Sequence, residues 1–153
     1  MKKNKIKIKI KANKDGNVLN LTVDHKPQNE KEKERIEKNG GFVENNRVNG
    51  KLAMSRSFGD LQYKDNQNFT DKIVSTIPDI TTFNLKEEKI KYFLLSSDGL
   101  FDHLKSEQVI KFISRRIDQS DPLPSILKEL IEFSKNEGSQ DNHTIILIKC
   151  NLK

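Results

Sequence analysis

The chain has 153 residues, 33% of them hydrophobic, and its 28 Lys and Arg exceed its 22 Asp and Glu by six. This is the length of one modest domain, with no apolar run near the 18 or so residues of a membrane-spanning helix and no apolar signal segment at the N-terminus. We therefore expect an intracellular protein, cytoplasmic or nuclear, and the lone Cys150, which cannot form an internal disulfide, fits a reducing compartment.

The excess of positive charge lies at the N-terminus. Residues 1–14 hold seven Lys and no acid, whereas the rest of the chain carries 21 basic and 22 acidic side chains. From Lys5 to Lys11, Lys and Ile alternate strictly, which is typical of a half-buried strand. A nucleic-acid-binding arm would not need the isoleucines and would favour Arg, so we expect no nucleic-acid partner. The lack of a long apolar run leads us to expect no membrane partner either.

The first half of the chain predicts short strands around one charged helix. The Lys/Ile strand runs to Asn13, and a turn at Asp15-Gly16 joins it to a second strand at Val18–Val23 in a hairpin. A surface helix is expected over Glu30–Asn39, ended by Gly40-Gly41. Two further ranges fit short strands, 42–44 and 47–53, and the polar stretch 61–76 predicts a long irregular loop.

The second half predicts strands, then two helices, then a returning strand. Strands are expected at Ile77–Leu85, Tyr92–Leu95 and Thr144–Ile148. One helix begins at Ser106, and a second has Asp121 as its N-cap with Pro122 at its first position. This order indicates an α+β fold in which helices cover an antiparallel sheet.

Two acidic residues stand where buried strands end. Asp98 follows the apolar run 92–95, and Asp141 precedes the last strand. Carboxylates at the ends of neighbouring strands can converge, and hard oxygen ligands select Mg²⁺ or Mn²⁺ over zinc. On the residues alone an alternative stays open, in which Asp98 forms a turn, Asp102 caps the next helix and Asp141 closes a loop.

Five ordered motifs resemble those of the metal-dependent protein phosphatases of type 2C. They are LTVDHKP (21–27), EKERI (32–36) followed by Gly40-Gly41, RVNGKLAMSRSFGD (47–60), SDGLFD (97–102) and GSQDNHT (138–144). Order and spacing agree from about Val18 to the C-terminus. The resemblance implies the C-terminal half of an α-β-β-α sandwich, in which antiparallel sheets are flanked by helices.

The resemblance also implies a chemistry and the residues that serve it. The family hydrolyses phosphoserine and phosphothreonine with two Mg²⁺ or Mn²⁺ ions that hold an attacking water. Asp98 and Asp141 match two metal-binding aspartates, and Asp102 matches a residue linked to a weaker third metal. The segment 61–76 coincides with the family's variable flap, so it is a candidate contact for a phosphoprotein substrate.

Other matching residues are expected to be scaffold. Asp24–Pro27 should fix a strand-to-helix turn, and Arg56 with Asp60 should brace a loop below the metals. His25, His103 and His143 are interpreted as turn or surface residues, and we assign no catalytic residue.

Several features of the family are missing from the sequence. It has no Asp-Gly-His-Gly-Gly segment, which supplies the bridging Asp and the general-acid His, and no counterpart of the phosphate-binding Arg. We therefore divide the chain into the Lys/Ile strand, 1–14, and a partial phosphatase domain, 15–153, which should be a poor enzyme alone. Three hypotheses follow. The first is the C-terminal half of a working phosphatase, completed by another chain or by a segment lost from the sequence. The second is a non-catalytic pseudophosphatase that acts as a binding or structural module, and the third, least favoured, is a basic nucleic-acid module.

Overall fold

The structure is a computed structural model that describes residues 9–14, 17–64, 72–82, 84, 87 and 89–150. The chain divides into two compact units: one comprises residues 24–80, and the other comprises the chain up to Val23 together with the chain from Thr81 onward. We call them the α1 unit and the sheet unit. The proposed boundary between residues 14 and 15 stays a prediction, and residues 1–8 lie outside the described part.

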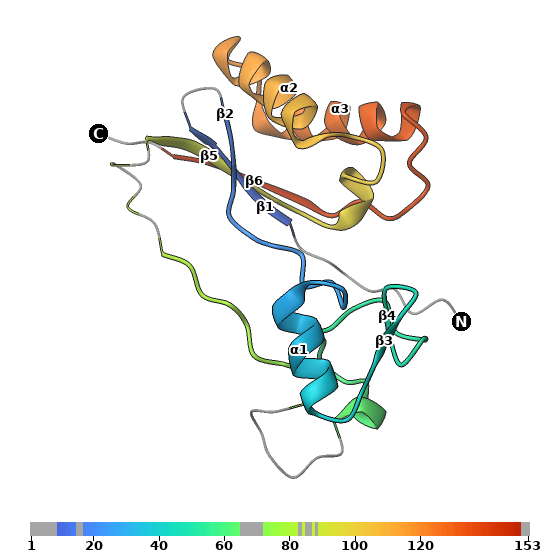
Figure 1. Ribbon diagram of the computed structural model, residues 1–153. Helices are drawn as coiled ribbons and strands as arrows, with labels where there is room; N and C mark the ends of the chain where they lie inside the picture. The colour runs from blue at the N-terminus through green and yellow to red at the C-terminus, as the bar shows by residue number, and fades with distance from the viewer. Residues whose placement is uncertain are drawn as a thin grey trace. The chain divides into compact units, whose positions relative to one another are not determined.

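The sheet unit is built on a four-stranded antiparallel sheet (Figure 1). Its strands, in spatial order, are β2 (Asn17–Asn20), β1 (Lys9–Lys14), β5 (Ile90–Ser96) and β6 (Ile145–Lys149). The predicted hairpin is confirmed, with Lys14 opposite Asn17. Its second strand ends at Asn20 rather than Val23, whose side chain is 74% exposed.

Strand β5 lies inside this sheet and supplies its core. Its buried residues alternate along the strand as Ile90, Tyr92, Leu94 and Ser96, the period-two pattern of a strand with one covered face. Helices α2 (Ser106–Asp118) and α3 (Leu123–Asn136) cover that face (Figure 1). The Tyr92 hydroxyl donates to the Ile110 carbonyl of α2 at 2.9 Å, so its polar end is satisfied within the core.

The helix pair follows the predicted apolar spacing, with one correction at the start of α3. Pro122, not Asp121, is the N-cap of that helix, and the Asp121 carboxylate instead accepts from Arg116 at 2.9 Å. At the other end Gly138 has φ +101°, a conformation that side chains other than glycine rarely adopt. No helix among the residues described is both long and apolar enough to cross a membrane.

The other face of the sheet carries apolar side chains that α2 and α3 do not cover. Phe93 pairs with Ile148 and Leu95 with Ile146, so these four side chains share one face. Ile146 is 53% exposed and Ile148 48% exposed. Strand β6, predicted as a core strand, is therefore an edge strand with a half-open apolar face.

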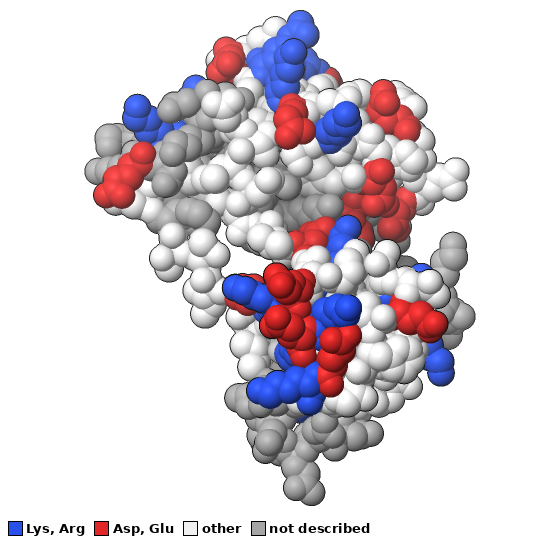
Figure 2. Space-filling view, in the orientation of Figure 1, with Lys and Arg blue, Asp and Glu red and all other residues white. Residues whose placement is uncertain are grey.

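The α1 unit packs a charged helix and a small hairpin around a separate core. The helix α1 (Glu30–Lys38), the strands β3 (Val43–Glu44) and β4 (Arg47–Val48) and the short 3₁₀ helix η1 (Leu61–Tyr63) are its elements. Its buried apolar residues are Ile36, Val48, Leu52, Tyr63 and Val74. Figure 2 shows acidic and basic side chains interspersed on this unit, as the α1 sequence EKEKERIEK leads one to expect.

Two predictions for this part of the chain need correction or remain partly open. The strand expected at Ile77–Leu85 is wrong over the described residues 77–82 and 84, which form no strand. Pro78 lacks a backbone donor, and side chains satisfy this segment instead, since Arg56 donates to the Ile77 carbonyl at 3.0 Å. Of the predicted loop 61–76, residues 65–71 lie outside the described part.

A buried carboxylate organises the α1 unit. Glu32 is 3% exposed and accepts hydrogen bonds from Arg56 at 2.6 Å, Arg35 at 2.8 Å and the Ser55 hydroxyl at 2.5 Å. Burial alone would raise the pKa of Glu32, but these three donors outweigh burial and lower that pKa to about 2. Arg56 joins Glu32 to Asp79, because its Nη1 also donates to the Asp79 carboxylate at 2.8 Å.

Acid should therefore weaken the α1 unit. The folded-state pKa of Glu32, about 2, lies below its ordinary value of 4.5, so its contribution is fully present above pH 4.5 and is lost as pH falls toward 2. That contribution is at most about 3 kcal/mol, from the pKa difference. Urea unfolding at successive pH values, followed by hydrogen exchange of the α1 amides, should show the loss. A stability unchanged across this window would contradict it.

Candidate functional site

The first predicted metal ligand, Asp98, lies directly after the central strand of the sheet unit. β5 ends at Ser96, and Asp98 opens the short 3₁₀ helix η2 (Asp98–Leu100) with its side chain half-buried. The Phe101 amide donates to the Asp98 carbonyl at 2.7 Å, which closes this turn. Gly99 and Leu100 in this turn are buried, while the Asp98 side chain stays partly exposed.

The second predicted ligand, Asp141, lies in the loop between α3 and β6. Its side chain is exposed, and its Oδ1 accepts from the Asn142 amide at 2.7 Å. Because β5 and β6 are antiparallel neighbours, with Ser96 opposite Ile145, the end of β5 and the start of β6 meet at one edge of the sheet. The fold therefore brings the Asp98 and Asp141 loops together.

Hydrogen bonds through Ser97 join the two loops. Its amide donates to the Thr144 carbonyl at 2.9 Å, and its hydroxyl donates to the Asn142 carbonyl at 3.0 Å. The same hydroxyl accepts from the Thr144 amide at 3.1 Å. The buried Ser97, directly before Asp98, thus binds backbone groups of Asn142 and Thr144, which follow Asp141 in the chain.

Gly99 makes a second junction, on the other side of Asp98. A Cβ at this position would lie 2.5 Å from the Asn142 carbonyl oxygen and 3.3 Å from the Asp141 Cβ. The Gly99 carbonyl accepts from the Ser139 hydroxyl at 2.8 Å and, more weakly, from Ser134 at 3.4 Å. The absence of a side chain at Gly99 is what allows the loops to touch.

Sequence reasoning did not single out these serines. Ser134, on α3, is fully buried, and its hydroxyl lies 3.0 Å from Nε2 of His143, which was interpreted as a turn or surface residue. The available signal was small: one serine near each predicted metal ligand, Ser97 directly before Asp98 and Ser139 two residues before Asp141. The contacts themselves depend on how β5 and β6 pair.

Asp102, the third predicted ligand, is exposed and lies beyond η2. It does not cap the next helix, because the N-cap of α2 is Lys105, whose amide donates to Gln108 at 2.9 Å. The neighbouring His103 is also exposed, and its ring lies 3.6 Å from the Cβ position of Gly138. The role of Asp102 stays a prediction.

The described residues offer the oxygen ligands that a divalent cation prefers, but too few of these ligands lie together to enclose an ion. Asp98 and Asp141 offer the carboxylate oxygens that Mg²⁺ and Mn²⁺ prefer, on loops in contact. Within the described ranges, however, no three His, Cys, Asp or Glu side chains gather closely enough to hold a metal ion. The two aspartates are therefore suited to be part of a site that needs further ligands.

The residues predicted as scaffold lie in the α1 unit and make structural contacts. The turn at Asp24–Pro27 is closed by the Lys26 amide, which donates to the Asp24 carbonyl at 3.0 Å. His25 lies 2.8 Å from the Asp79 carboxylate, and hydrogen bonds first from His25 and then from Arg56 lower the pKa of Asp79 to about 2. Asp60, predicted to brace this region together with Arg56, accepts from the Ser57 hydroxyl at 2.8 Å, and the shared bracing role stays a prediction.

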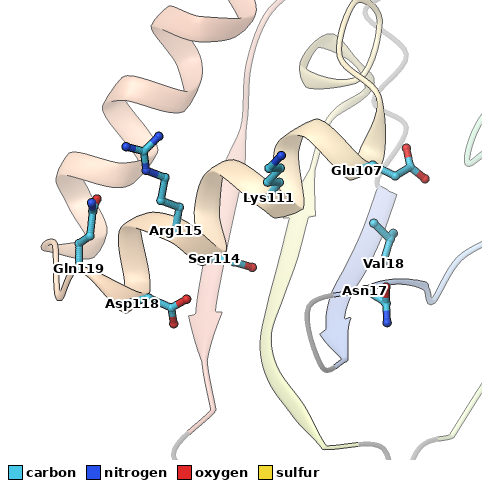
Figure 3. Close-up of a pocket in the computed structure, with 8 residues that line it drawn as sticks. All are labelled: Asn17, Val18, Glu107, Lys111, Ser114, Arg115, Asp118 and Gln119. Atoms are coloured by element: carbon cyan, nitrogen blue, oxygen red, sulfur yellow. The ribbon is translucent and has the colours of Figure 1, made fainter.

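A separate groove lies on the sheet unit between β2 and α2 (Figure 3). It has a volume of about 800 Å³ and is lined by Asn17, Val18 and one side of α2 from Glu107 to Gln119. In Figure 3 both acidic and basic side chains of α2 border it, so it has no single charge preference. Neither Asp98 nor Asp141 lines this groove.

Comparison with known proteins identifies the family. The model of the family Protein phosphatase 2C matches residues 10–143, so the match begins within the Lys/Ile segment. Protein phosphatase 1A of Homo sapiens is 38% identical over 130 residues, and Protein phosphatase 1B of Bos taurus is 37% identical over 137. A crystal structure of a phosphatase from Toxoplasma gondii superposes with a TM-score of 0.77 at 26% identity, over 93% of this chain.

The antiparallel sheet with its two covering helices, matched in a solved phosphatase, thus defines an α+β fold of the phosphatase class. The chain belongs to the protein phosphatase 2C family. The match to the human relative covers 84% of this chain but only 34% of that relative, and the match to the bovine relative covers 88% of this chain and 28% of that relative. The superposition covers 45% of the Toxoplasma chain. The chain therefore spans about a third of the length of the curated relatives.

Proposed function

We propose that this chain supplies Asp98 and Asp141 to the metal site of a Mg²⁺- or Mn²⁺-dependent protein serine/threonine phosphatase. The observation that carries the proposal is the contact between the two loops, since a Cβ on Gly99 would lie 3.3 Å from that of Asp141. Family membership supports the same assignment, because the matched range, residues 10–143, contains both aspartates. Asp102, which follows η2, is the candidate for a weaker third ion.

The chain's own contribution is positional and electrostatic. Bound ions of this kind lower the pKa of a coordinated water and neutralise charge on phosphoryl oxygens. Asp98 and Asp141 would hold such ions through their carboxylates, on backbone fixed by β5 and β6. With two carboxylates and no Asp-Gly-His-Gly-Gly segment in its sequence, the isolated chain should bind metal weakly and hydrolyse phosphoesters poorly.

The proposal includes a complementary chain or segment that supplies the remaining ligands. The half-open face formed by Phe93, Leu95, Ile146 and Ile148 supports this inference, because such apolar surface is stabilised when another layer covers it. The share of the relatives that this chain leaves uncovered is large enough for that layer. The substrate would be a phosphoprotein, and the segment 61–76 remains the candidate for contacting it.

The alternative is a non-catalytic relative that uses the half-fold as a binding or structural module. The Lys/Ile strand favours it, because the resemblance leads one to expect at this place a Gly-Asp-Ser-Arg-like segment whose Asp helps to bind the third metal. This chain instead has a Lys-rich strand, in which Lys9 lies opposite Ser96 at the end of β5. A basic strand at this edge would compete with bound cations through like-charge repulsion. The two functions differ in whether the assembled domain responds to Mn²⁺.

Reconstitution tests the proposal. The chain should be mixed with a fragment of human Protein phosphatase 1A that carries the part of that relative not covered here, and hydrolysis of a phosphothreonine peptide measured against Mn²⁺ concentration. We expect Mn²⁺-dependent turnover of the complex and little from either part. Asp98→Ala and Asp141→Ala should each lower it on the order of 100-fold or more, because a direct ligand is lost.

The matched control is Asp118→Ala, which removes an exposed carboxylate from the end of α2 in the same unit. It should leave turnover within about twofold. A complex verified by size-exclusion chromatography that shows no response to Mn²⁺ would contradict the catalytic proposal and support the binding module.

A further inference from the structure

The two neighbours of Asp98 in the chain are both tied to the loop that carries Asp141. On one side, the Ser97 hydroxyl donates to the Asn142 carbonyl at 3.0 Å and accepts from the Thr144 amide at 3.1 Å. On the other side, the Gly99 carbonyl accepts from the Ser139 hydroxyl at 2.8 Å. Asp98 therefore sits between two cross-loop junctions.

Both hydroxyls are shielded from water, which makes their hydrogen bonds effective constraints. Ser97 is 8% exposed and Ser139 is 6% exposed. A buried hydroxyl that loses its hydrogen-bond partner is left unsatisfied away from water, so these bonds resist opening. Ser96 provides a contrast: it is also buried, at 3% exposed, but within the described part of the chain its hydroxyl bonds to the carbonyl of the adjacent Ser97, at 3.0 Å, and not to the opposite loop.

We propose that Ser97 and Ser139 are positioning residues that fix the separation of the Asp98 and Asp141 carboxylates, and so set the affinity of the site for a divalent cation. This inference rests on the proposed function for its consequence, but the constraint itself is a property of the chain. Groups that orient metal ligands without touching the metal commonly change affinity by about 10–100-fold when removed.

The first experiment measures the constraint without any metal. Amide hydrogen exchange should be compared in the full chain for wild type, Ser97→Ala, Ser139→Ala and the control Ser96→Ala. We expect Ser97→Ala to release amides 142–144 and Ser139→Ala to release amides 99–101, in each case across the loop boundary. Ser96→Ala should leave the opposite loop protected.

The second experiment measures the consequence in the reconstituted complex described above. Ser97→Ala and Ser139→Ala should each raise the Mn²⁺ concentration for half-maximal turnover about tenfold or more, while the rate at saturating Mn²⁺ stays within about threefold. Ser96→Ala should change neither value beyond about twofold. A purely structural loss would lower the saturated rate instead and leave the half-maximal concentration unchanged.

The outcomes separate this inference from the proposed function. If neither alanine variant alters exchange in the opposite loop, the positioning role is overturned, whatever the complex does. If exchange changes but the Mn²⁺ response of an active complex does not shift, the serines hold the loops without tuning the site, which also overturns it. A wild-type complex with no Mn²⁺ response refutes the proposed function, and exchange then decides the constraint alone. The two variants lie in different loops, so misfolding of one leaves the other decisive.

Discussion

Replacing Glu32 by Gln should destabilise the α1 unit by about 3 kcal/mol. The substitution keeps the size of the side chain but removes the charge that Arg35 and Arg56 share at 2.8 and 2.6 Å. Breaking a buried ion pair by removing one partner costs about 3–5 kcal/mol, because the remaining charge is left uncompensated. Both arginine side chains are largely buried, 17% and 19% exposed, so water compensates them only in part.

The measurement is urea unfolding followed by hydrogen exchange of the amides of Glu30–Lys38, which reports on this unit alone. Glu34→Gln is the matched control, because Glu34 lies on the same helix and is exposed. It should change stability by no more than about 0.5 kcal/mol. An equal effect of the two substitutions would show that the Glu32 network contributes nothing beyond helix electrostatics.

Hydrophobic periodicity predicted the elements whose stability comes from one buried face. β5 alternates from Ile90 to Ser96, and α2 buries Val109, Ile110 and Ile113 at helical spacing. In both cases the pattern and the tertiary environment select the same structure, so local reasoning succeeds. β5 begins two residues before and ends one residue after its predicted bounds, and α2 begins at the predicted Ser106.

The strand prediction failed where side chains, rather than a neighbouring β-strand, supply the hydrogen bonds of the backbone. The run Ile77–Leu85 has the composition of a strand, but Arg56 binds the Ile77 carbonyl and the Asp79 carboxylate, and Ile80 is 86% exposed. Arg56 reaches these groups across more than 20 residues of sequence, and no local pattern records that pairing.

The candidate site was predictable in its residues but not in its construction. The family resemblance selected Asp98 and Asp141, whose loops the structure brings into contact. The contact depends on the antiparallel register of β5 and β6 and on bonds from Ser97 and Ser139 to backbone carbonyls. Backbone acceptors carry no sequence signal, since every residue has one, so these bonds could be found only in three dimensions.

Gly99→Ala should be the most damaging small substitution in the sheet unit. The added Cβ would lie 2.5 Å from the Asn142 carbonyl oxygen, a distance that non-bonded atoms do not adopt, and the obstacle is backbone rather than a flexible side-chain end. Relief requires the Asp98 and Asp141 loops to separate, which also strains the bond from Ser139 to the Gly99 carbonyl. Overpacking of this kind costs about 3 kcal/mol.

Urea unfolding followed by exchange of the β5 amides should record that loss. Gln140→Ala, an exposed change in the Asp141 loop, is the matched control and should stay within about 0.5 kcal/mol. Because Gly99→Ala moves the loops without removing a carboxylate, it should also weaken the Mn²⁺ response of the reconstituted complex more than either serine variant does. A stable Gly99→Ala chain with an unchanged Mn²⁺ response would mean that close contact of the two loops is not what aligns the aspartates.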